Sequence, residues 1–176
     1  SPESRTSHRP SRPPGATRPS PPRVGLELLE RDELERRGVR RLDMLLISHS
    51  HRDHIGGADA LLTAMPVAAY MNNDLEPDTL IHKKVRSIVA RRSITRLHPR
   101  SQNLSLSCAD LHIIAPPGDV GGDEENNASI GVLVKRGPFA APLTGDSERE
   151  ELSAWCAAEK IPPVTVLKAP HHGSRN

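Results

Sequence analysis

Aromatic residues are almost absent from this sequence: of its 176 residues, only Tyr70, Phe139 and Trp155 are aromatic. The hydrophobic core therefore has to be built mainly from Leu, Ile, Val and Ala. The same scarcity argues against a protein that binds nucleic acid by stacking bases on aromatic side chains. No apolar run reaches the ~18 residues that a membrane-spanning helix needs, so the sequence predicts a soluble chain.

Cysteine and net charge are also low. Cys108 and Cys156 lie far apart and outside any CxxC pattern, which argues against a zinc finger and a disulfide-rich framework. We expect both thiols to be buried, in a reducing compartment. The formal net charge of +2 does not by itself indicate a nucleic-acid partner. One stretch, from Lys83 to Arg100, carries cations without an intervening acid; it either contacts phosphates or forms the solvated face of a helix.

The composition divides the chain into two parts. Residues 1–24 are rich in Pro and Arg and poor in apolar side chains, so they are predicted to be a disordered leader. Residues 25–176 alternate between helical and strand patterns, which predicts one α/β domain. Helices are expected at 26–37, 58–65, 80–92 and 148–160, and strands at 42–48, 67–71, 94–97, 111–115, 130–135, 139–143 and 164–168, the last of them buried.

Five of the nine histidines stand in two clusters, each just after an expected strand. The first cluster is His49-Ser50-His51-Arg52-Asp53-His54. Side chains on a loop at a strand end can converge on one point, and imidazole and carboxylate are ligands of zinc and similar metals. The pair His49 and His51 and the pair Asp53 and His54 therefore suit two adjacent metal ions. The alternative, a polar loop with incidental histidines, fits this dense pattern poorly.

Two later motifs offer further ligands. Asp146 follows the expected strand 139–143; alone it would suit a helix cap, but beside the first cluster it becomes a candidate bridging carboxylate. His171 and His172 precede Gly173, which permits a tight turn. One of these histidines is expected to complete the second metal site, and the other to hold a bound phosphate or carboxylate or to orient a ligand. The sequence does not distinguish between them.

Together these motifs resemble the metallo-β-lactamase superfamily and, within it, the ComEC-like competence branch. The resemblance spans roughly residues 35–175 and rests on four stretches: 41–57, 126–129, 143–146 and 166–174. It implies an αββα sandwich with two divalent metal ions, zinc or manganese, between the sheets. By position in the motifs, metal one would be bound by His49 and His51, metal two by Asp53, His54 and either His171 or His172, with Asp146 bridging.

The sequence departs from the family pattern in two places. Residues 124–129 lack the histidine that many members carry there, so metal one is short of a ligand unless Glu125 or Asn126 supplies an oxygen. A site richer in oxygen would favour manganese or magnesium over zinc. The family's usual segments at both ends have no counterpart here, so we expect a sandwich that lacks edge strands and exposes strand edges.

The resemblance implies a metal-dependent hydrolase that uses a water bound between two metals. Asp53 and His172 are the expected catalytic residues. Substrate contacts are expected from Asn126, Asn127, Ser129, Lys168 and Ser174. The competence branch implies a phosphodiesterase or nuclease acting on DNA during uptake, located outside the cytoplasm if the chain is part of a larger membrane channel protein and in the cytoplasm otherwise. The alternatives are a hydrolase of small esters, lactones or thioesters, and a truncated, inactive remnant.

Overall fold

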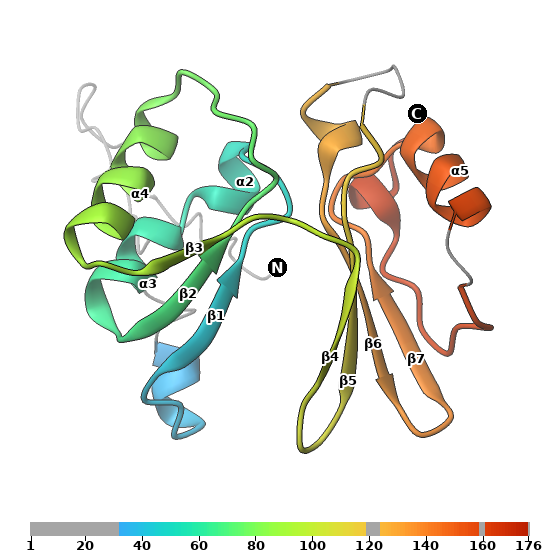
Figure 1. The fold of residues 1–176 in the computed structure, drawn as a ribbon, viewed down its shortest axis with the longest axis horizontal. Helices are drawn as coiled ribbons and strands as arrows, with labels where there is room; N and C mark the ends of the chain where they lie inside the picture. The colour runs from blue at the N-terminus through green and yellow to red at the C-terminus, as the bar shows by residue number, and fades with distance from the viewer. Residues whose placement is uncertain (1–31, 119–123, 159–160, 176) are drawn as a thin grey trace, which may run out of the picture.

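The computed structural model describes residues 32–118, 124–158 and 161–175. Within these residues the chain forms two sheets that face each other, with helices on both outer sides (Figure 1). One sheet is parallel, with the order β1-β2-β3, and the other is antiparallel, with the order β4-β5-β6-β7. The predicted α/β class and the αββα layering are confirmed.

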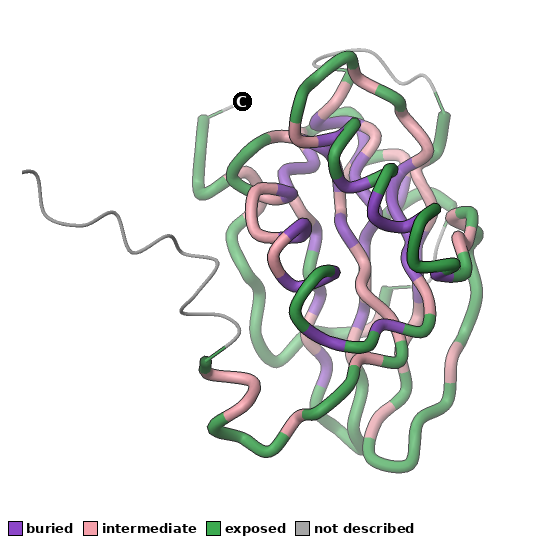
Figure 2. Tube along the Cα trace, turned by 90° about the vertical axis from the view of Figure 1, so that its left-hand side faces the viewer, coloured by how far each residue is buried: buried purple, intermediate pink, exposed green. Residues whose placement is uncertain are grey.

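The parallel half contains β1 (Leu42–Leu46), β2 (Val67–Met71) and β3 (Thr95–Leu97), with three helices: α2 (Arg52–Ile55), α3 (Ala58–Ala64) and α4 (Leu80–Arg91). Parallel strands need such crossovers, because the chain must return to the same end of the sheet. Figure 2 looks onto these helices and shows buried residues on the sides that meet the sheet, with exposed residues outside. Leu62, Tyr70 and Val85 are central to this core.

The antiparallel half contains four strands, β4 (Gln102–Ser105), β5 (Asp110–Ile114), β6 (Gly131–Arg136) and β7 (Phe139–Leu143), two short 3₁₀ helices, η1 (Asn126–Ala128) and η2 (Pro170–Gly173), and the helix α5 (Arg149–Ala158). Trp155 of α5 is buried against β6. A Cβ at Gly131 would lie 2.8 Å from the ring of Trp155, so this glycine lets the indole pack directly on the strand.

A second core lies between the sheets and includes Met71, Ile113 and Ile130. Side chains of β1 alternate, so Met44 and Leu46 pack in this core while neighbouring residues face the helices. A strand covered on both faces has no polar side, which explains the continuous apolar run at 44–47. β1 is thus held between two layers, and it delivers the first histidine cluster at its C-terminal end.

The prediction of a buried strand at 164–168 is wrong. This segment passes the edge of β7, where the amides of Thr165 and Val166 both donate to the carbonyl oxygen of Ala140. Because both bonds go to one acceptor, no ladder of successive pairs develops. Val166 and Leu167 are more than half exposed. Exposed and buried apolar residues look alike in a sequence, and this run was therefore misread.

Both cysteines were predicted to be buried, and this is wrong: Cys108 and Cys156 are exposed free thiols. Cys108 lies in the turn after β4, and Trp155, not Cys156, takes the inward side of α5.

The predicted leader, residues 1–24, lies outside the described residues, as does the first part of the helix expected at 26–37. Residues 32–36 of that helix are helical. In the described part of the chain, no helix combines the length and apolar character needed to cross a bilayer.

Candidate metal centre

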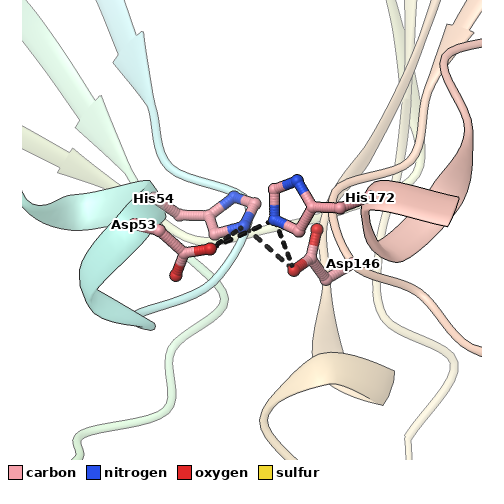
Figure 3. A group of neighbouring side chains, drawn as sticks. All are labelled: Asp53, His54, Asp146 and His172. Carbon is pink, nitrogen blue, oxygen red and sulfur yellow. Dashed lines mark hydrogen bonds and ion pairs between the residues drawn. The ribbon is translucent and has the colours of Figure 1, made fainter. Parts of the chain in front are cut away.

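Two carboxylates and two imidazoles meet at one end of the sandwich (Figure 3). Asp53 and His54 come from α2, on the parallel half. Asp146 follows β7, and His172 belongs to η2, on the antiparallel half. Each of the four residues offers one ligand atom, and the four atoms lie within 4.8 Å of one another.

Each contact inside this group joins the Nε2 atom of a histidine to the Oδ2 atom of an aspartate. Nε2 of His172 lies 3.1 Å from Oδ2 of Asp53 and 3.2 Å from Oδ2 of Asp146. Nε2 of His54 lies 3.1 Å from the same Asp146 oxygen, yet within the described residues it has no partner with hydrogen-bond geometry. The buried Oδ1 of Asp146 has none there either. Buried polar atoms rarely stay unsatisfied, and these nitrogen and oxygen donors are those that divalent cations bind. The residues therefore fit a metal ion.

His49 and His51 lie beside this group. Nε2 of His49 is 3.2 Å from Nδ1 of His51, and the rings of His49 and His54 are 4.1 Å apart. His49 is fully buried. Burial, followed by repulsion from His54 and His51, lowers the pKa of His49 to about 4. Its imidazole is therefore neutral at pH 7, the state that a metal ligand needs.

Gly145 brings the Asp146 turn close to the histidine loop. Its φ is +58°, and a Cβ there would lie 2.8 Å from both Oγ of Ser129 and Cβ of Ser48. A side chain would therefore push β7 away from the end of β1. The helix α5 begins only at Arg149, and the carboxylate of Asp146 faces the histidines. The helix-cap interpretation of Asp146 is thus not the one that the geometry favours.

The two adjacent histidines of η2 point to different partners. His172 contacts the two carboxylates, whereas Nδ1 of His171 lies 3.3 Å from Oε1 of Glu148. His171, His172 and Gly173 are all left-handed, with φ of 42°, 52° and 81°. Such a backbone is costly for residues with a Cβ, and strain of this kind concentrates at functional sites. The geometry favours His172 over His171 as the ligand.

Two serines fix the position of the histidine loop, Ser48 through its hydroxyl and Ser50 through its backbone amide. Oγ of Ser48 lies 3.1 Å from Nδ1 of His49 and 3.4 Å from Nδ1 of His54. Contacts of this kind orient a ligand ring and fix its tautomer. The backbone amide of Ser50 donates to Oε1 of Glu125 at 2.7 Å, so the carboxylate that was a possible ligand of metal one also anchors the loop. Ser48 could not be singled out from the sequence, because a serine before a histidine carries no distinctive spacing.

The five predicted substrate residues divide into two groups. Asn126, Asn127 and Ser129 are buried. Oδ1 of Asn127 accepts a hydrogen bond from the amide of Glu148 at 3.0 Å, and Oγ of Ser129 lies 3.4 Å from Nδ1 of His49. These contacts favour a supporting role, and their assignment to substrate stays a prediction.

The other two predicted substrate residues are exposed. Lys168 donates to the carbonyl oxygen of Gly145 at 3.1 Å. Ser174 lines a cleft of about 470 Å³ between α5 and η2, together with His171 and Arg149. This cleft therefore opens beside the metal-ligand group.

The basic stretch from Lys83 to Arg100 has partners within the protein. Lys83 and Lys84 pair with Asp78 and Asp59, Arg86 pairs with Glu76, and Arg96 pairs with both Asp74 and Glu76. Arg92 donates to the carbonyl oxygens of Leu62, Thr63 and Met65 at the end of α3. Of the two interpretations of this stretch, the structure favours a solvated, ion-paired helix face.

Comparison with known proteins agrees with the geometry. The model of the metallo-beta-lactamase superfamily matches residues 20–174. The chain belongs to this superfamily. It is similar to ComE operon protein 3 of Bacillus subtilis, with 25% identity over 147 residues, and to Recombination protein 2 of Haemophilus influenzae, with 28% identity over 142 residues. Each alignment covers 81% of this chain but only 18% and 16% of the respective relative. The metallo-beta-lactamase domain described here thus spans less than a fifth of the length of these relatives.

Proposed function

We propose that the chain is a metal-dependent hydrolase with two divalent ions, zinc or manganese, bound among His49, His51, Asp53, His54, Asp146 and His172. The observation that carries the proposal is the convergence of four ligand atoms within 4.8 Å, with the histidines at Oδ2 of Asp146. The other oxygen of this carboxylate, the buried Oδ1, has no hydrogen-bond partner among the described residues. Ions held there would activate a water molecule and stabilise negative charge on the group under attack.

Asp53 and His172 are the proposed catalytic residues. Burial raises the pKa of Asp53. Its own backbone amide, His54 and His172 lower the pKa by more than burial raises it, so the pKa lies below its usual value. The carboxylate is therefore ionised at neutral pH and can orient the attacking water or take its proton. The carboxylate of Asp53 and the imidazole of His172 are more than half exposed, so both can reach a substrate. His172 would assist the leaving group.

The proposed substrate is a phosphodiester, with single-stranded DNA as the main candidate. The name of one relative refers to recombination, a reaction of DNA, and the ComEC-like motifs point the same way. The cleft beside the site supplies a cation, because Arg149 lines it and pairs with no acid among the described residues. Cations near the scissile bond favour anionic substrates. If the chain is part of a larger channel protein, it acts on incoming DNA outside the cytoplasm.

A substrate panel tests this proposal. The purified chain, loaded with zinc or manganese, is assayed on bis-p-nitrophenyl phosphate, single-stranded DNA and a lactone. We expect turnover of the two phosphodiesters that is lost in His51→Ala and Asp53→Ala. It should be kept in His98→Ala, which removes an exposed histidine whose partner is Asp74 and not a proposed ligand. Turnover of the lactone alone would instead indicate a hydrolase of small esters. A chain that binds metal but hydrolyses nothing would support the inactive remnant.

A further inference from the structure

Glu151 is a buried acid that the proposed function does not use. It lies in the first turn of α5 and is 0% exposed. Neither of its carboxyl oxygens has a partner with hydrogen-bond geometry in the described part of the chain. A buried carboxylate whose lost hydration is only partly compensated is costly. A residue of this kind calls for an explanation from its surroundings.

The residues around Glu151 adjoin the candidate metal centre. The groups that act on its carboxyl are the side chain of Ser147 and the backbone of Ser129. Ser147 directly follows the bridging candidate Asp146. Oγ of Ser129 accepts from the amide of Asp146 at 3.3 Å and lies 3.4 Å from Nδ1 of His49. Ser129 therefore lies between Glu151 and the histidine ligand His49, and Ser147 connects Glu151 to the candidate bridging carboxylate of Asp146.

Among the described residues, no cation contributes to the pKa of this acid. Burial raises the pKa of Glu151 to about 8, while Ser147 and the Ser129 backbone lower it only in part, and no charged side chain contributes. Two acids close to it in sequence, Glu148 just before α5 and Glu150 in its first turn, accept hydrogen bonds from Asn126 and Asn127 of η1. Metal ions at His49 and Asp146 would bring positive charge to the far side of Ser129 and Ser147.

We propose that Glu151 is a positioning residue of the metal centre, a neutral acid behind Ser129 and Ser147 in the metal-free chain that becomes a buried counter-charge when cations bind. This inference rests on the proposed metal site. On ionisation the O–H bond of the carboxyl breaks and the proton passes to the buffer. Attraction across a weakly polar interior favours the ionised form once the cations are in place. Metal binding and loss of this proton are therefore coupled.

Calorimetric titration of the metal-free chain tests the coupling. Zinc or manganese is added at pH 7 in two buffers of different ionisation enthalpy, which gives both the affinity and the number of protons released. We compare the wild type with Glu151→Gln and with Glu150→Gln, a matched change at the adjacent exposed acid. Glu151→Gln is expected to release about one proton fewer and to bind metal roughly 10-fold to 100-fold more weakly, the usual effect of losing an outer-shell group. Glu150→Gln should match the wild type.

Equal proton release and affinity in Glu151→Gln and wild type would overturn the inference while leaving the metal site intact. A wild-type chain that binds no metal would overturn the proposed function as well. Should Glu151→Gln fail to fold, infrared difference spectra of the wild type decide the matter. The carbonyl stretch of a protonated carboxylic acid should be present without metal at pH 7 and disappear when metal is added. A spectrum that shows no such loss would contradict the inference.

Discussion

The Nε2 atom of His172 lies 3.1 Å from Oδ2 of Asp53, although 119 positions separate the two residues. Asp53 belongs to the parallel half of the sandwich and His172 to the antiparallel half (Figure 3). The candidate metal centre therefore joins the two halves. Each half alone supplies only part of the ligand set, so the site exists only when both sheets are packed.

The first prediction separates the two histidines of η2. His172→Ala removes an imidazole that contacts both carboxylates, so the chain should lose at least one metal ion. His171→Ala removes the partner of Glu148 and should keep both ions, with kcat reduced by roughly 10-fold to 100-fold. Elemental analysis of the two purified variants measures the difference. Loss of metal from His171→Ala together with full loading of His172→Ala would reverse this assignment.

Local motifs were the part of the site that could be predicted from the sequence. His49, His51, Asp53 and His54 lie within six positions, and their clustering follows from the turn after β1. Asp146 and the pair His171-His172 were found because each stands beside a glycine turn after an apolar run, but the sequence did not say which histidine of the pair is the ligand. The ends of β1 and β7 then bring the first cluster and Asp146 together, whereas His172 reaches them from η2, which follows no strand in the described chain.

Contacts made only in three dimensions could not be predicted. Glu151 reads as an ordinary surface acid in a charged helix, and only the packing of α5 against η1 buries it. Asn127 and Ser129 were assigned to substrate, because the sequence does not tell a polar residue that faces a ligand from one that supports a ligand histidine. β4 was not predicted because its sequence, Gln102–Ser105, is mostly polar. Its only strand partner in the described sheet is β5.

The second prediction concerns the contact between α5 and β6. Gly131→Ala would place a methyl group 2.8 Å from the ring of Trp155, and overpacking of this kind costs about 1–3 kcal/mol. Trp155 is the only tryptophan of the chain, so its fluorescence during urea unfolding reports the loss directly. An unchanged unfolding midpoint would mean that the helix shifts freely on the sheet.

The third prediction is a pH dependence of the metal-free chain. Because folding raises the pKa of Glu151 from 4.5 to about 8, the folded chain keeps a proton that the unfolded chain releases. Stability from this group is thus complete below pH ~4.5 and declines as the pH rises toward 8. Glu151→Gln does not titrate there, so its stability relative to wild type should increase between pH 5 and pH 8 by more than about 1.4 kcal/mol, the equivalent of one pKa unit.

Urea unfolding of the metal-free proteins at a series of pH values measures this difference. Glu150→Gln is again the control, and it should follow the wild type at every pH. A constant difference between Glu151→Gln and wild type across this range would show that Glu151 titrates as an ordinary glutamate in the folded chain.

The fourth prediction concerns the cleft between α5 and η2. If the cation of Arg149 contacts a DNA phosphate, Arg149→Gln should reduce the slope of log kcat/KM against log salt by roughly 0.7 for single-stranded DNA. Hydrolysis of bis-p-nitrophenyl phosphate, which has no neighbouring phosphate, should hardly change. Arg136→Gln removes an exposed cation at the remote end of β6 and is the matched control. Equal slopes for the two variants would place the DNA elsewhere.

The most direct test of the metal centre is anomalous diffraction from crystals of the chain loaded with zinc or manganese, collected at the absorption edge of the metal. The proposed function predicts two adjacent peaks, one contacted by His49 and His51 and one by Asp53, His54 and His172, with Asp146 between them. Crystals of fully loaded protein with no anomalous peak at these residues would contradict it.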